Sequence, residues 1–217
     1  MKKLSLLGIA LSLIVLSGCI TIFEKYTIHA NGTGTMEYII DMTEMYEMMA
    51  SFSDSTETME SPGINESLQE AIPGLNDIEG ISNVSITGDG SEYIAGIKFD
   101  FKNADALNLA IGVLFNREAD AGIKYVALKG KTFTRFNQTS EEFNKEELLG
   151  SEELDEETMK MILESMKYNI SVSFDKNVKK VSTKAPYTME EKNVLIETNF
   201  SEIFNNEDFL KTIIKSK

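Results

Sequence analysis

Along much of this chain, apolar and polar residues alternate on both sides of short turn signals. Residues 26–30 and 35–40 show this period of two, and Asn31-Gly32 lies between them. The pattern predicts an antiparallel hairpin with one apolar face. Two further hairpins are predicted on the same grounds, over 84–101 around Gly88-Asp89-Gly90 and over 123–136 around Lys129-Gly130-Lys131. Further strands are predicted over 168–174, 178–183 and 194–198.

Between the hairpins, the apolar spacing changes to that of amphipathic helices. Met45 and Met49 fall on the apolar side of a helix over 42–52. Asn65 is expected to cap a short helix that ends at residue 72, because Pro73-Gly74 follows it. Further helices are predicted over 104–115, over 159–166 at the end of an acidic stretch, and over 207–215, where Phe209, Leu210, Ile213 and Ile214 form a stripe.

The helix over 104–115 is the most apolar of these, and Asn103 is its predicted cap. Asn108 and Gly112 are among the few residues expected to face outward, whereas Leu109 and Val113 widen the apolar face. Two interpretations follow. The helix is buried over most of its circumference, or its second flank lines a groove for acyl chains or for a partner.

Together these patterns predict about eight strands, joined mostly by hairpins, and four or five helices. Because the helices lie between hairpins rather than after every strand, a doubly wound parallel sheet is disfavoured. The predicted fold class is α+β, with a largely antiparallel sheet built from hairpins and with helices packed on one face.

The start of the chain has a pattern of its own. Two lysines precede an apolar run over 4–15, and Leu16-Ser17-Gly18-Cys19 offers a small-residue cleavage site. An apolar run of this length is short for a membrane span and is typical of a secretory signal peptide. We therefore expect a signal peptide over 1–18, a short tether over 19–23 and a single α+β domain over 24–217.

The motif Leu16-Ser17-Gly18-Cys19 resembles the lipobox of bacterial lipoproteins. The resemblance implies diacylation of the Cys19 thiol, cleavage before Cys19 and acylation of the new amino terminus. Several acyl chains would hold the mature protein on its membrane. The alternative is an ordinary secretory signal in which Cys19 is incidental. Cys19 is the only cysteine of the chain, so an internal disulfide is excluded.

The residue after Cys19 bears on the membrane to which the protein is sorted. It is Ile20 rather than aspartate, and no acidic cluster follows it. Among Gram-negative lipoproteins, the resemblance therefore implies a lipid-anchored protein of the outer membrane that faces the periplasm.

The charge of the chain excludes one class of partner. Its 35 acidic and 21 basic residues give a formal net charge of −14. Such a charge repels nucleic-acid phosphates at long range, so we expect no nucleic-acid partner. Many acidic residues fall over 141–166, where they form either a solvated face or a surface for a divalent cation or a basic partner.

The side chains needed for the common kinds of catalysis are scarce. His29 is the only histidine, so the chain cannot build a multi-histidine zinc site, and the single Cys19 excludes a Cys-His pair in the mature domain. The sequence contains no nucleophile elbow around a serine, no Walker loop and no dinucleotide-binding glycine motif. We expect a protein that is not an enzyme and that has no cofactor and no metal site.

Six methionines concentrate in the first part of the chain: Met36, Met42, Met45, Met48, Met49 and Met59. Thioether ligands favour Cu(I), which is one interpretation. Met45 and Met49 also fit an apolar helix face, where methionine either fills a core or forms an adaptable binding surface. Together with Leu109 and Val113, they are the candidate residues for a hydrophobic ligand.

The order of these features is similar to that of the LppM-like bacterial lipoproteins. The shared features are the lipobox, an immediate strand with an Asn31-Gly32 hairpin, a helical middle, and a strand that ends Val172-Ser173-Phe174 before further strands. In that family Pro-Gly commonly follows the aromatic residue, whereas this chain has Asp175-Lys176. The resemblance implies a membrane-tethered α+β domain of the cell envelope that handles lipids or glycolipids, and it brings no catalytic residues.

The expected function is therefore that of a membrane-anchored, non-enzymatic envelope lipoprotein that binds a lipid or another hydrophobic envelope component. The alternative is a protein-protein interaction or scaffold subunit of an envelope complex, which would use the acidic surface. A ligand-binding protein should contain a continuous apolar cavity, whereas an interaction subunit should have a filled core and an exposed patch.

Overall fold

The computed structural model describes residues 20–52, 63–88, 91, 93–116, 122–137, 156–206 and 208–217. In these residues the elements are, in order, β1 (Ile20–Ile28), β2 (Gly34–Asp41), α2 (Thr43–Phe52), α3 (Ile64–Asn76), β3 (Ile81–Thr87), β4 (Ile94–Phe101), α4 (Ala104–Leu114), β5 (Val126–Lys129), β6 (Thr132–Arg135), α7 (Glu156–Ser165), β7 (Met166–Phe174), β8 (Val178–Ser182), β9 (Tyr187–Glu190), β10 (Asn193–Asn199), α8 (Phe200–Asn205) and β11 (Thr212–Ser216).

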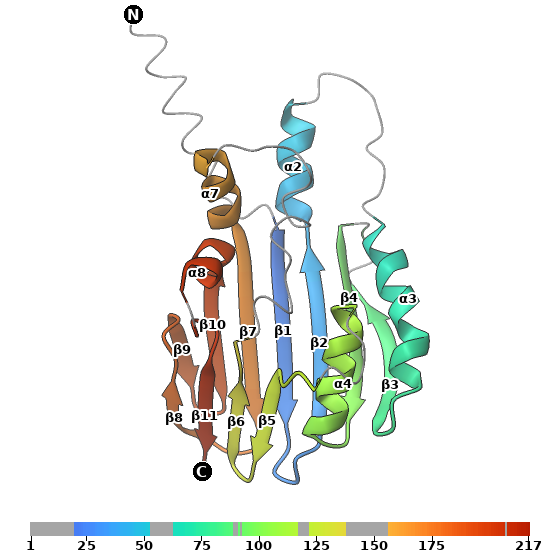
Figure 1. Ribbon diagram of the computed structural model, residues 1–217, viewed down its shortest axis with the longest axis vertical. Coiled ribbons are helices and arrows are strands. Elements are labelled where there is room, and N and C mark those ends of the chain that lie inside the picture. Colours follow the sequence, from blue (N-terminus) through green and yellow to red (C-terminus); the bar gives the residue numbers. More distant parts are fainter. Residues whose placement is uncertain are drawn as a thin grey trace, which may run out of the picture.

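The strands form two sheets (Figure 1). The large sheet has seven strands in the order β3-β4-β2-β1-β7-β10-β9, and the small sheet has four in the order β5-β6-β11-β8. All strand pairs are antiparallel except β1 with β7 at the centre of the large sheet. The fold is α+β, as predicted, but the single sheet that we expected is divided into two.

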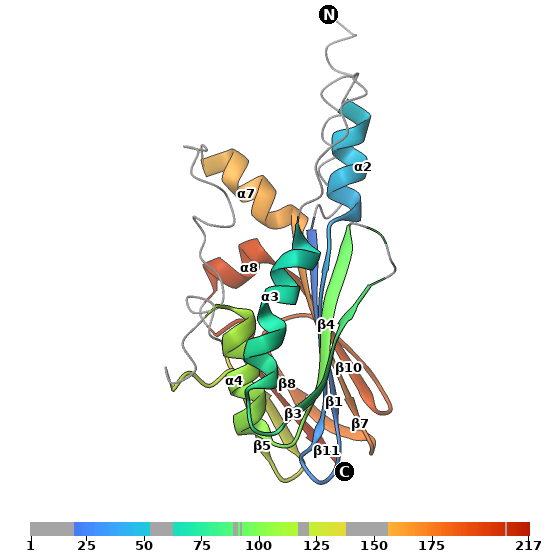
Figure 2. The same ribbon diagram turned by 90° about the vertical axis from the view of Figure 1, so that its right-hand side faces the viewer.

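One face of the large sheet carries the other elements (Figure 2). Helices α3, α4 and α8 lie against this face. The small sheet lies on the same side, because Phe133 of β6 packs against Tyr26 of β1 with ring centroids 5.2 Å apart. The core fills the space between these layers and contains the inward side chains of both sheets. Helix α2 instead extends from the end of β2 beyond the edge of the sheet (Figure 1).

The first hairpin forms as predicted. Residues 29–33 join β1 to β2, and the backbone NH of His29 donates to the carbonyl of Thr33 at 2.9 Å. On β1, Ile22 and Tyr26 are buried while Lys25 is exposed, so the alternation read from the sequence separates core from solvent. The predicted hairpins β3–β4 and β5–β6 are also present.

Three boundaries differ from the predictions. β1 already begins at Ile20, so most of the expected tether over 19–23 belongs to the sheet, where Ile22 is buried. Helix α3 continues past Pro73 to Asn76, because its last turn buries Leu75 completely. The chain end is not a helix. It forms β11, in which Ile214 is buried and Ile213 is exposed, and β11 pairs with β6 and β8 in the small sheet.

Helix α4 begins as predicted, with the side chain of Asn103 accepting from the backbone NH of Ala106 at 2.9 Å. Its orientation differs from the prediction. Gly112 is buried, whereas Leu109 is 36% exposed to solvent. Asn108 was expected to face solvent, but its side chain forms hydrogen bonds with the backbone at the start of β5. The periodicity of apolar residues does not predict this polar contact between α4 and β5.

Replacing Asn108 with alanine is expected to lower the free energy of unfolding by about 2 kcal/mol. Its side-chain oxygen accepts from the backbone NH groups of Tyr125 and Val126 at 2.7 and 2.9 Å, and both donors would lose this partner. Urea unfolding followed by circular dichroism measures the loss. The control is Leu109→Ala on the exposed side of the same helix, for which we expect a change below about 0.5 kcal/mol. Equal losses of unfolding free energy for the two variants would contradict a stabilising role of the Asn108 hydrogen bonds.

Candidate functional site

A cleft opens between the two sheets at the end of the molecule where β1 meets the β1–β2 turn. It encloses about 70 Å³. The β1–β2, β5–β6 and β7–β8 connections surround it, together with the last residues of the chain. These segments lie far apart in the sequence, and they come together because β1 pairs with β7 while β11 joins β6 and β8.

The floor of this inter-sheet cleft is apolar and its rim is polar. Ile28, Phe133 and Phe174 are at most 8% exposed and form the floor with Leu128. Ile28 and Phe174 are the last residues of β1 and β7, and Leu128 of β5 pairs with Phe133 of β6. Alternation within four separate strands thus builds one continuous surface. The charged side chains of the rim are three lysines and one aspartate: Lys131, Lys176, Lys217 and Asp175.

Hydrogen bonds to Asp175 close one side of the rim. The Nδ1 atom of His29 lies 3.0 Å from one oxygen of Asp175, and the backbone NH of Ala30 donates to the other at 3.0 Å. The hydrogen bond with His29, followed by that from Ala30, lowers the pKa of Asp175 from its ordinary value. His29 therefore joins the β1–β2 turn to the β7–β8 turn. It directly follows the last residue of β1, and its side chain is exposed.

A second, open hollow of about 610 Å³ lies on the other side of His29. The β1–β2 turn, the start of β3 and the end of β4 line it, and its walls are more polar than those of the inter-sheet cleft. Within it Asp100 accepts hydrogen bonds from the side chains of Asn83 and Thr35, both at 2.7 Å. These two bonds lower the pKa of Asp100. Because both oxygens of Asp100 already accept hydrogen bonds from this chain, the hollow is a weaker candidate for a ligand site than the cleft.

Deeper in the gap between the sheets lies a fully buried ion pair. Glu24 of β1 and Arg135 of β6 are both 0% exposed. The Nε and Nη2 atoms of Arg135 donate to the two carboxylate oxygens of Glu24 at 3.0 and 2.8 Å. The hydroxyls of Tyr26 and Tyr168 donate to the same two oxygens at 2.7 and 2.5 Å. Four donors thus satisfy the carboxylate and connect the two sheets.

The positive charge of Arg135 offsets the cost of burying the Glu24 carboxylate. Burial by itself would raise the pKa of Glu24, but the charge of Arg135 and its hydrogen bonds, with those of the two tyrosines, lower it overall. Glu24 is therefore ionised in the folded protein. This pair lies directly beneath the cleft floor. Arg135 is the next inward residue after Phe133 on β6, and Glu24 is separated from Ile28 on β1 by one inward residue, Tyr26, whose ring packs on Phe133.

The structure separates the residues that we predicted as a hydrophobic ligand site. Met45 is half-buried on α2, at the end of the large sheet where β1 begins, while Leu109 and Val113 lie on α4, which lies over the opposite half of the sheet (Figure 1). Val113 packs near Gly74 of α3. None of these three residues lines either of the two cavities described above. The side chain of Met49, like Cys19 and the leader over 1–18, lies outside the described residues.

Glu24 and Arg135 are the residues that sequence reasoning missed. A signal for each was present, because both fall on the inward side of an alternating strand, next to Tyr26 and Phe133 respectively. A charged residue on an apolar face is rarely buried without a partner. Each of the two therefore indicated a buried partner of opposite charge, although the sequence alone does not say which residue that partner is.

Among the described residues there is neither a cluster of metal-ligating side chains nor a helix that could span a membrane. The part of the chain that the structure describes contains no group of three or more histidine, cysteine, aspartate or glutamate side chains placed to hold a metal ion. Within the same residues, no helix is both long enough and apolar enough to cross a bilayer.

No family model matches the sequence, and no curated protein matches it. Among solved structures, the chain is similar to the folded domain of LppM from Mycobacterium tuberculosis, determined by NMR. The two share 11% sequence identity over 93% of this chain and 91% of that one, with a TM-score of 0.46.

Proposed function

We propose that this is a lipid-anchored, non-enzymatic protein of the cell envelope, and that it binds a lipid or another hydrophobic envelope component in the inter-sheet cleft. The observation that carries the proposal is the apolar floor formed by Ile28, Phe133 and Phe174 at the open end of the gap between the sheets. A concave apolar surface with a few polar groups at its rim is typical of a site for a small ligand.

The size of the cleft restricts what can enter it. A volume of about 70 Å³ is small beside the roughly 300–1,000 Å³ of sites that enclose a whole drug-sized molecule. We therefore expect the cleft to take the end of an acyl chain or a single ring, with the remainder of the ligand outside. The lysines at the rim, Lys131, Lys176 and Lys217, favour a ligand whose exposed part is polar or anionic.

The proposed anchor lies at the opposite end of β1. The motif that resembles a lipobox ends at Cys19, and β1 begins at the next residue, Ile20. A strand of nine residues spans about 30 Å. A lipid anchor at Cys19 would thus hold the cleft away from the membrane surface, and the identity of Ile20 favours the periplasmic face of the outer membrane.

Native mass spectrometry with lipid extraction tests the ligand. The protein comprising residues 20–217 is expressed in a bacterial host and purified without detergent, and we expect a bound lipid at one copy per chain. Replacing Leu128 at the cleft floor with asparagine should remove at least about nine-tenths of it, because a polar amide would be placed on the apolar surface without a partner.

The matched control is Leu109→Asn on α4, which lies outside the cleft and should keep the bound lipid. Circular dichroism checks that both variants are folded. Loss of lipid from the Leu109 variant alone would move the site to the groove that the sequence predicted. A wild-type protein with no lipid would overturn the hydrophobic-ligand proposal, and crosslinking of the intact chain would then test the alternative of an envelope interaction subunit.

A further inference from the structure

Three lysines form a row across the outer face of the small sheet. Lys129 of β5 pairs in register with Thr132 of β6, Thr132 with Lys215 of β11, and Lys215 with Lys180 of β8. Directly paired residues of antiparallel strands project from the same face. All three lysines are exposed, whereas Phe133 and Ile214 in the neighbouring row are buried, so this row faces solvent.

The arrangement is electrostatically unfavourable for the isolated protein. Lys215 and Lys180 are directly opposite each other, and like charges in that position destabilise a sheet. Among the described residues, none of the three lysines has an ion-pair partner. The chain is rich in acidic residues, with 35 against 21 basic ones, yet none of the described ones pairs with this row.

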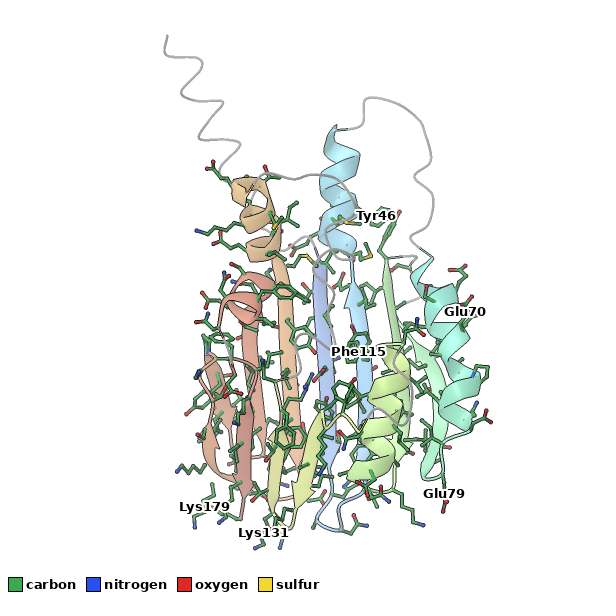
Figure 3. All side chains as sticks on the ribbon, in the orientation of Figure 1. Tyr46, Glu70, Glu79, Phe115, Lys131 and Lys179 are labelled. Atoms are coloured by element: carbon green, nitrogen blue, oxygen red, sulfur yellow. The ribbon has the colours of Figure 1, made fainter. Side chains whose placement is uncertain are left out.

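The surroundings of the lysine row are also basic. Further exposed lysines at the same end of the molecule are Lys131, Lys176, Lys179 and Lys217. Figure 3 shows Lys131 and Lys179 together at this end, far from Glu70 on α3. The acidic side chains nearby are Asp175, which is paired with His29, and Glu190 and Glu191 at the end of β9 in the large sheet. Exposed lysines therefore gather on the small-sheet side of this end, whereas Glu79, also at this end, lies across the molecule near β3.

We infer that the lysine row binds a linear polyanion that carries repeated phosphate groups. Lysine ammonium groups act as point charges toward phosphate, without the bidentate geometry by which arginine selects a single planar anion. Neighbouring strands are about 4.8 Å apart, which places Lys180 and Lys215 about 5 Å apart and Lys129 about 10 Å from Lys215 at the backbone. A line of charges at such intervals matches a polymer better than one small anion.

Two observations favour a polymer over a bilayer surface. The adjacent outward row consists of Ala127, Thr134, Ile213 and Ser182, in which Ile213 is the single large apolar side chain. Stable docking on a bilayer generally buries a larger apolar surface. The row also lies at the opposite end from Ile20, where β1 begins. Lys129, Lys180 and Lys215 are not among the residues that line the inter-sheet cleft, although its rim lysines lie close by, so the inference goes beyond the proposed ligand.

Binding of linear inorganic polyphosphate to residues 20–217 tests the inference. The buried residues of the described chain lie between Ile22 and Ser216, so this portion contains the whole core. Isothermal titration calorimetry should show binding that weakens as salt is added. The variant Lys129→Gln/Lys180→Gln/Lys215→Gln should bind about tenfold more weakly, through the loss of three exposed ion pairs. Its melting temperature should not fall, because repulsion within the row is removed.

The matched control is Lys98→Gln/Lys102→Gln/Lys160→Gln, which removes the same charge from exposed sites on other elements and should change the affinity less than about twofold. Equal weakening of both triple variants would assign binding to net charge and overturn the inference. The inference would also be overturned if the protein bound phosphatidylglycerol vesicles but not polyphosphate, or if it bound neither. The cleft variant Leu128→Asn should bind polyphosphate as the wild type does.

Discussion

Replacing Arg135 with methionine is expected to lower the free energy of unfolding by about 3–5 kcal/mol at neutral pH. Methionine keeps much of the side-chain volume but leaves Glu24 as a fully buried carboxylate without its cation. The two tyrosine hydroxyls that remain on Glu24 cannot supply a positive charge. Urea unfolding followed by circular dichroism measures the change.

The pH dependence of this variant should differ in sign from that of the wild type. In the wild type the pKa of Glu24 is lowered, so its stabilising contribution is present above the ordinary glutamate pKa and is lost as the pH falls through the folded value. Without Arg135, burial raises that pKa, and the folded state binds the proton more tightly than the unfolded state. The destabilisation should therefore be smaller at about pH 4 than at about pH 7.

The double variant Glu24→Leu/Arg135→Met provides the control. Replacing both charges by apolar groups is often neutral or stabilising, so much of the loss should be recovered. Recovery should be incomplete, because the hydroxyls of Tyr26 and Tyr168 lose their acceptor. A loss below about 1 kcal/mol for Arg135→Met alone, as for an exposed pair, would show that the pair is not buried as described.

Replacing Ile214 with alanine is expected to lower the free energy of unfolding by about 2–5 kcal/mol. Its side chain is 0% exposed in the core, on the inward side of β11. Alanine would leave a cavity there, next to Phe133 and Val181 on the paired strands. The loss is measured by urea unfolding, with the midpoint and the slope compared between variants.

Ile213→Ala is the matched control, one residue away on the same strand. Ile213 is 40% exposed on the outward side, so we expect a change below about 1 kcal/mol. The comparison also distinguishes β11 from the helix that we predicted over 207–215, in which both isoleucines share one apolar stripe. Similar losses for the two variants would favour the helix and contradict the strand.

Local patterns were sufficient for the hairpins and for α4. Alternation around Asn31-Gly32 and around Gly130 correctly predicted two of the hairpins, because both strands and their turn lie within a short segment. The same local view failed at the chain end. Over 207–215 the apolar residues fit a helical stripe, but the strand forms because β6 and β8 offer backbone partners on both sides.

The candidate sites were less accessible from the sequence. Leu109 was expected to line a groove because it widens an apolar helix face, yet the helix turns Asn108 toward the start of β5 and leaves Leu109 exposed. The inter-sheet cleft was not predicted, since its floor combines Ile28, Phe133 and Phe174 from three strands. Which distant strands become neighbours depends on the pairing of the whole sheet.

The α+β class, the alternating strands and the positions of most turns could be predicted from the amino-acid sequence, because they follow from spacings of a few residues. The tertiary structure decided which strands pair, that β1 lies parallel to β7, and that Glu24 meets Arg135 at a separation of 111 residues along the chain. These depend on the free energy of burying particular side chains against one another, and spacing along the chain does not contain that information.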